Sequence, residues 1–149
     1  MYKVKIIKNR PDCRMFQDLL FNKHKNHENI DGDGDSFHIY SKSWTELYLI
    51  DRLEPHYFID IYPNDNDSSY FEIHSNNSNF AELCSIYLYE YCGNSIEKDN
   101  KKLSLNEIIT LQNKFFTKLE EARTSIWHKS NENNPYPQPV LGEKYLARR

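Results

Sequence analysis

Glycine and long apolar runs are scarce in this chain, and each shortage excludes a class of protein. Only 4 of its 149 residues are glycine, and neither a glycine-rich phosphate loop nor a Gly-x-Ser-x-Gly nucleophile motif occurs. No stretch approaches the roughly 18 consecutive apolar residues that a membrane helix needs. Residues 1–8 alternate charged and apolar side chains and lack the apolar core of a signal peptide. We therefore expect a cytoplasmic protein that does not bind membranes.

The 3 cysteines and 6 histidines do not have the spacing of known metal or catalytic sites. Cys84 and Cys92 are expected on one helix, about 12 Å apart along its axis, which is too far for a disulfide. The chain contains no His-Glu-x-x-His motif. We expect reduced, structural thiols, with no metal and no cofactor.

Charge is distributed very unevenly along the chain. Residues 1–27 carry a net charge of +5, residues 28–99 carry −12 and residues 100–149 carry +4, so the total of −3 conceals an acidic middle. An acidic surface of this size attracts basic proteins and discourages binding to nucleic acid. We therefore expect a basic protein partner and no nucleic acid.

Hydrophobic periodicity predicts a run of strands that begins at the N-terminus and continues through the acidic region. The expected strands are Tyr2–Lys8, Phe37–Ser41, Thr45–Arg52, Tyr57–Tyr62 and Tyr70–His74. Trp44–Arg52 also fits a helical period, but its β-branched and aromatic content favours a strand. His24–Asp35 is polar and is expected to be a loop.

Three segments have the periodicity of helices. A short helix opens at Pro11, and a second begins with Asn79 as its N-cap and stops at Gly93. A capping pair, Ser104 and Glu107, precedes a long helix that is expected to reach about residue 128.

The order β-α-β-β-β-β-α-α predicts a two-layer α+β domain of residues 1–129. It contains an antiparallel sheet of about five strands with helices packed on one face. Residues 130–149 are rich in proline and are expected to form an extended or mobile C-terminal tail.

The acidic repeat Asp31-Gly-Asp-Gly-Asp35 can be aligned with a calcium-binding loop in two registers. Asn29–Tyr40 has the required central glycine but starts with asparagine and ends with tyrosine. Asp31–Lys42 starts with aspartate but lacks that glycine and ends with lysine. Neither register has the closing carboxylate, so we interpret the repeat as a solvated acidic turn.

The densest cluster of functional groups lies on a predicted hairpin of residues 57–74. Alternation directs Tyr57, Ile59, Ile61, Phe71 and Ile73 toward the core, and Phe58, Asp60, Tyr62, Tyr70, Glu72 and His74 away from it. Pairing centred on Asn66 would place Asp60 opposite Glu72, which is a destabilising like-charge pair. A register shifted by two residues would instead pair Asp60 with His74.

This patch allows three interpretations. Two adjacent carboxylates and a histidine could form a catalytic acid/base site. Tyrosines among carboxylates are also typical of surfaces that bind Arg- and Lys-rich proteins. The patch could otherwise be an ordinary exposed face, or one covered by the tail with Lys144, Arg148 and Arg149.

Residues 57–97 carry a family resemblance. An Ile-Asp-Ile-Tyr-Pro strand, an acidic loop and Tyr-Phe-Glu-Ile-His-Ser precede a helix that ends in Cys-Gly-Asn-Ser-Ile-Glu. This succession resembles small α+β immunity proteins of bacterial polymorphic toxin systems, of the contact-dependent inhibition or type VI secretion kind. The resemblance implies a cytosolic, non-catalytic protein that plugs the basic active-site cleft of a toxin.

The first hypothesis is therefore a non-catalytic cytoplasmic inhibitor or immunity protein that binds a cognate, basic toxin or enzyme through an acidic surface. The expected partner-binding residues are Asp60, Tyr62, Tyr70, Glu72 and His74, with Asp31, Asp33, Asp35, Asp65 and Asp67 in flanking loops. One alternative is a small acid/base hydrolase that uses Asp60, Glu72 and His74. Another is a phage or host accessory interaction protein.

Overall fold

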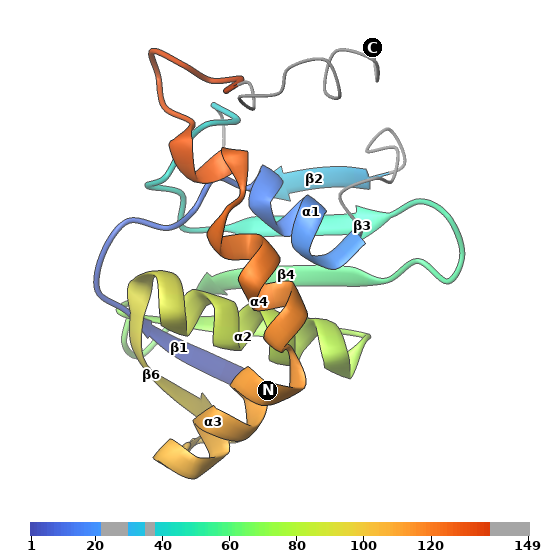
Figure 1. Ribbon diagram of the computed structural model, residues 1–149. Helices are drawn as coiled ribbons and strands as arrows, with labels where there is room; N and C mark the ends of the chain where they lie inside the picture. The colour runs from blue at the N-terminus through green and yellow to red at the C-terminus, as the bar shows by residue number, and fades with distance from the viewer. Residues whose placement is uncertain (22–29, 35–37, 138–149) are drawn as a thin grey trace.

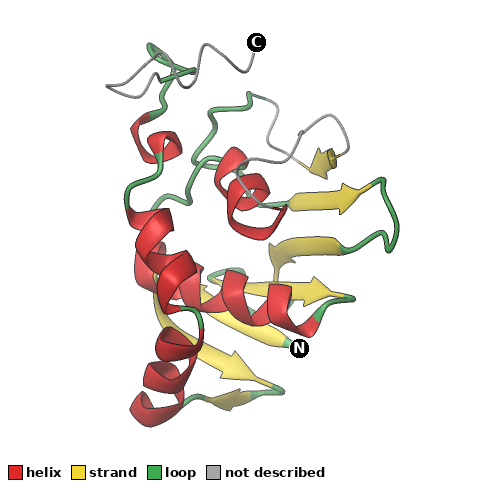
Figure 2. Cartoon of the chain, turned by 45° about the vertical axis from the view of Figure 1, so that its right-hand side comes forward, coloured by secondary structure: helices red, strands yellow, loops and turns green. Residues whose placement is uncertain are grey.

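The computed structural model describes residues 1–21, 30–34 and 38–137 as one sheet with a layer of helices on one of its faces (Figures 1 and 2). The helices are α1 (Arg14–Phe21), α2 (Ser78–Cys92), α3 (Leu105–Lys114) and α4 (Phe116–Arg123), followed by a short 3-10 helix, η2 (Ile126–Lys129). This arrangement confirms the predicted two-layer α+β class.

The sheet is antiparallel throughout the part of the chain that the structure describes, and it has the order β2-β3-β4-β5-β1-β6-β7. Its strands are β1 (Tyr2–Ile6), β2 (Ile30–Gly34), β3 (Leu47–Asp51), β4 (Phe58–Pro63), β5 (Tyr70–Ser75), β6 (Gly93–Lys98) and the two-residue β7 (Lys101–Lys102). Seven strands are present where about five were expected. The N-terminal strand β1 lies between β5 and β6, so it joins the hairpin half of the sheet to the β6–β7 half.

The core lies between the sheet and α2, which packs on β1, β5 and β6. α2 also packs against α1 and α3, and it is buried on more than one side. Its fully buried residues include Cys84, Ile86 and Leu88. No helix among the described residues combines the length and the apolar character required to cross a bilayer.

Trp44 anchors the segment before β3 to α1. Its side chain is 1% exposed, and its indole N–H donates to the backbone carbonyl of Pro11 at 2.7 Å. The rings of Trp44 and Phe16 pack edge to face, with their centroids 5.9 Å apart. The segment Trp44–Arg52 therefore contains a strand, β3 (Leu47–Asp51), as its β-branched and aromatic residues predicted. Trp44 lies just before this strand and packs in the core.

Two expectations in the first half of the chain are wrong. His38–Ser41 is a turn and not a strand, closed by a hydrogen bond from Ser41 N to His38 O at 2.7 Å; Phe37 lies outside the described residues. Conversely, residues 30–34 form β2, although 24–35 was expected to be a loop. β2 pairs with β3 along its whole length, so the ladder to a neighbouring strand outweighs the low strand propensity of its glycines and aspartates.

The expected helices exist, but their limits differ. Asn77, not Asn79, is the N-cap of α2, and its side chain accepts from the backbone N–H groups of Asn79 and Phe80. The capping box of Ser104 and Glu107 is confirmed. The long helix after it is interrupted, because Phe115 leaves helical geometry between α3 and α4.

Gly93 ends α2 where expected, but for a different reason. Its φ of −115° is extended and not left-handed, and the chain continues directly into β6. A Cβ at this position would lie 2.6 Å from Val4 Cγ1 and 2.9 Å from the carbonyl oxygen of Lys5. Glycine is therefore required by the close approach of the end of α2 to β1.

We expect Gly93→Ala to destabilise the protein by about 1–3 kcal/mol, because the added methyl group forces backbone and core side chains apart. Gly32→Ala is the matched control, since its Cβ would meet the end of the Leu49 side chain at 3.1 Å and the backbone oxygen of Tyr48 at an ordinary contact distance of 3.6 Å. The control should change the stability by less than about 1 kcal/mol. Urea denaturation of both variants measures the difference, and equal stabilities would contradict this account of Gly93.

Candidate functional site

The face of the sheet opposite the helices carries the predicted hairpin residues. We define this open face by the partly exposed side chains of Lys3, Lys5, Tyr48, Ile50, Phe58, Asp60, Tyr62, Tyr70, Glu72 and His74. Ile59, Ile61, Phe71 and Ile73 point the other way and are buried, as predicted. Tyr57 does not: it precedes β4, is 37% exposed, and its ring meets that of Phe80 at 5.5 Å. No helix among the described residues packs on the open face (Figures 1 and 2).

The hairpin adopts the shifted register of the two that the sequence allowed. Asp60 pairs with His74 across β4 and β5, and Tyr62 pairs with Glu72. This register avoids two carboxylates directly opposite each other. The loop supports it, because the side-chain oxygen of Asn64 accepts from the backbone N–H groups of Asn66 and Asp67.

Asp60 lies between two pairs of stacked rings. Tyr48 and Phe58 stack at 5.9 Å with their planes 4° apart, and Tyr62 and His74 stack at 5.2 Å with their planes 5° apart. Tyr48 and His74 are the cross-strand neighbours of Asp60, while Phe58 and Tyr62 precede and follow it on β4. The carboxylate is thus flanked by a ring on each of four sides.

The two carboxylates of the hairpin are in different electrostatic states. Burial raises the pKa of Asp60, and the nearby His74 only partly offsets this. Burial would also raise the pKa of Glu72, but hydrogen bonds from His74 at 3.0 Å and Asn64 at 2.8 Å outweigh it and lower that pKa. Burial and the Glu72 and Asp60 charges together raise the pKa of Tyr62.

The β1 side of the open face is basic, and both of its lysines have contacts within the protein. Lys3 lies 3.7 Å from the Glu97 carboxylate and donates to the Asn100 side chain at 2.9 Å. The ammonium of Lys5 lies 6.0 Å from the centre of the Tyr70 ring. The open face is therefore not uniformly acidic, and its unpaired negative charge is on the side formed by β3, β4 and β5.

The predicted loop aspartates are only partly brought to this face. Asp67 accepts from Ser69 in the β4–β5 loop, which lowers its pKa, and Asp65 is exposed beside it. Asp31 and Asp33 occupy β2, in register with Ile50 and Tyr48 of β3. Asp35 lies outside the described residues, as do residues 36 and 37 of each calcium-loop register and Asn29 of the first. Among the described residues, no group of three or more His, Cys, Asp or Glu side chains is placed to hold a metal ion.

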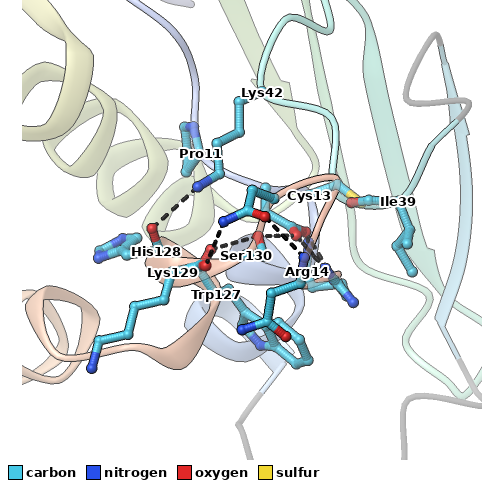
Figure 3. Close-up of polar contacts among 12 residues, drawn as sticks. Pro11, Cys13, Arg14, Ile39, Lys42, Trp127, His128, Lys129 and Ser130 are labelled. Carbon is cyan, nitrogen blue, oxygen red and sulfur yellow. Dashed lines mark hydrogen bonds and ion pairs between the residues drawn. The ribbon is translucent and has the colours of Figure 1, made fainter. Parts of the chain in front are cut away.

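A second polar cluster, which the sequence did not indicate, is buried between α1 and η2 (Figure 3). Asp12 is 0% and Arg14 4% exposed, and the guanidinium of Arg14 donates to both oxygens of the Asp12 carboxylate. The hydroxyl of Ser130 donates to the same carboxylate at 2.7 Å. The guanidinium also lies over the Trp127 ring at 4.1 Å. The cluster ties the end of the helical region to the start of α1 and is a stabilising contact.

His128 extends this contact to α2. Its Nε2 lies 2.7 Å from the Tyr87 hydroxyl, its ring stacks on Tyr91 at 4.9 Å, and Lys42 donates to its backbone carbonyl at 3.1 Å. Burial lowers the pKa of His128, the charge of Lys42 lowers it further, and a hydrogen bond to the backbone of Arg123 acts in the opposite direction. The neutral imidazole is therefore the form that this site favours.

Comparison with known proteins identifies no relative of this chain. No family model matches the chain, and no curated protein and no solved structure is significantly similar to it. The functional argument therefore depends on the geometry of the described residues.

We expect Asp12→Ala to lower the free energy of unfolding by about 3–5 kcal/mol, because it leaves the buried Arg14 guanidinium without a counter-charge. In the double variant Asp12→Ala/Arg14→Met no buried charge remains, so part of this loss should be recovered. Chemical denaturation of both variants provides the comparison. A double variant less stable than the single one would show that the ion pair is not what Asp12 contributes.

We expect stability to fall as the pH drops below about 6.5, the ordinary pKa of histidine. Above that value the imidazole of His128 is neutral in both states. Below it, the unfolded chain binds the proton first, so stability is lost until the pH passes the lowered pKa of the folded protein. When the denaturation midpoint is plotted against pH between 5 and 8, it should change less steeply for His128→Gln than for the wild type. Equal slopes for His128→Gln and the wild type would contradict this account of His128.

Proposed function

We propose that the protein is a non-catalytic inhibitor of the immunity-protein kind, which binds a basic toxin or enzyme through the β3–β4–β5 side of its open face. The observation that carries the proposal is the partly exposed group of rings around Asp60, on which no helix of the described residues packs. Interface centres are enriched in tyrosine and other aromatic residues, and the acidic residues 28–99 supply the complementary charge for a basic partner.

The geometry supports binding over catalysis. The hydrolase alternative needs two carboxyl groups whose pKa values are displaced in opposite directions, and Asp60 and Glu72 meet that requirement. A hydrolase, however, encloses its substrate in a concave site. Asp60, Glu72 and His74 instead lie on adjacent strands of a pleated sheet face. A surface of this shape suits another protein better than a small substrate.

The distribution of charge gives the orientation of the partner. Lys3 and Lys5 on β1 would repel a basic surface, whereas Asp60, Glu72 and the Asp65 loop would attract one. We therefore place the basic cleft of the partner over β4 and β5, with its edge toward β3. A protein bound in this way excludes substrate from the cleft by occupying it, and it needs no chemistry of its own.

To test this, the tagged protein is incubated with lysate of its host and of competing cells at low and at moderate salt. The wild type should retain a basic protein in stoichiometric amount, and any enzymatic activity of that protein should be inhibited in the complex. The Asp60→Lys/Glu72→Lys variant should bind it at least about tenfold more slowly, because charge reversal removes the electrostatic steering.

The matched control is Glu121→Lys/Glu132→Lys, which makes the same change of charge at two exposed positions outside the sheet. It should retain the partner as the wild type does. Equal loss of binding in the control would indicate a general charge effect, and full retention by the open-face variant would exclude this face as the interface.

A further inference from the structure

Asp60 differs from the other carboxylates of the open face and its margin, because among the described residues it has no hydrogen-bond or ion-pair partner. Glu72 accepts from His74 and Asn64, and Glu97 is paired with Lys3. The two lysines of this face are engaged on β1, with Glu97 and with the Tyr70 ring. The protein thus partly buries a negative charge at the centre of its open face, and among the described residues the nearby His74 only partly offsets the cost of this burial.

The surroundings of Asp60 are those of a cation-binding site. The ring faces of tyrosine and phenylalanine attract cations through their quadrupole, and Tyr48, Phe58 and Tyr62 lie on three sides of this carboxylate, with the His74 ring on the fourth. Water can solvate only the side of Asp60 that faces outward. A ligand that binds here must therefore carry a positive charge and also tolerate contact with aromatic surfaces.

Arginine meets both requirements better than lysine. Its guanidinium is planar, is weakly hydrated, stacks on aromatic faces and binds a carboxylate with two parallel hydrogen bonds. The chain already contains this combination in its interior, where Arg14 binds the Asp12 carboxylate while lying over the Trp127 ring. A lysine ammonium is compact and strongly hydrated, so it would lose more on entering the ring of aromatic side chains.

We infer that Asp60, with the Tyr48–Phe58 and Tyr62–His74 ring pairs, forms a receptor site for one arginine side chain of the protein partner. The inference rests on the proposed function and deepens it, because it names the group of the partner that the centre of the open face recognises. Glu72 has a different role: it is already bonded to His74 and Asn64 and holds the Tyr62–His74 pair in place.

The test uses the full chain and a probe that does not require the partner to be known. Nα-acetyl-arginine methylamide is titrated into isotope-labelled protein, and the shifts of the Asp60 carboxyl carbon and of the Tyr62 ring are followed by NMR. We expect saturable shifts at these groups, a several-fold weaker effect of the lysine analogue, and none of the citrulline analogue, which has the shape of arginine without its charge.

Two isosteric variants separate loss of the Asp60 site from a general change of charge. Asp60→Asn should weaken arginine binding by at least about tenfold, since it removes a charge-assisted, bidentate interaction. Glu121→Gln makes the same change of charge at an exposed position outside the sheet and should stay within about threefold of wild type. The amide spectrum of each variant reports whether it is folded, and the citrulline comparison needs no variant.

Several results would overturn the inference: no saturable shift at Asp60, an equal response to citrulline, or equal effects of the two variants. Binding of an oligouridylate that becomes tighter in Asp60→Asn would instead indicate a nucleic-acid surface. A failed arginine titration would overturn this inference but not the proposed function, which is tested separately. If the Asp60→Lys/Glu72→Lys variant no longer bound a basic partner that the wild type retains, the open face would still be identified as the interface.

Discussion

The pairing of β1 with both β5 and β6 is the interaction on which the rest of the structure depends. Without this strand, the β2–β5 half of the sheet and the β6–β7 half are not joined, and α2 loses the middle one of the three strands on which it packs. The same pairing brings the end of α2 so close to β1 that only glycine fits at position 93. The helices of the described residues then pack on one face of the completed sheet and none of them on the other.

Local features of this fold could be predicted from the sequence, because they depend on residues that are close together in the chain. The capping box of Ser104 and Glu107 and the alternation of the hairpin are of this kind. The N-cap of α2 was misplaced because Asn77 and Asn79 both have suitable side chains and only the folded chain selects between them. β2 could not be predicted, since a strand of glycine and aspartate forms only through its pairing with β3.

The candidate site shows the same division between local and long-range information. Which hairpin residues share a face followed from their alternation, but the choice between two registers, and with it the neighbours of Asp60, required the three-dimensional pairing. The buried pair of Asp12 and Arg14 is completed by Ser130, 118 positions away from Asp12, so no local pattern could reveal it. Whether a charged side chain has a partner is a property of the tertiary structure, and the argument about Asp60 depends on that property.

The central position of β1 also has a consequence for biosynthesis. Within this chain β1 emerges first from the ribosome, yet it obtains its second neighbour only after the residues of β6 have been made. Until then the edge of β1 that faces β6 is unpaired, and such edges pair readily with other chains. Pairing between distant segments is also slow. The newly made protein therefore passes through a period in which incorrect strand association competes with completion of the sheet.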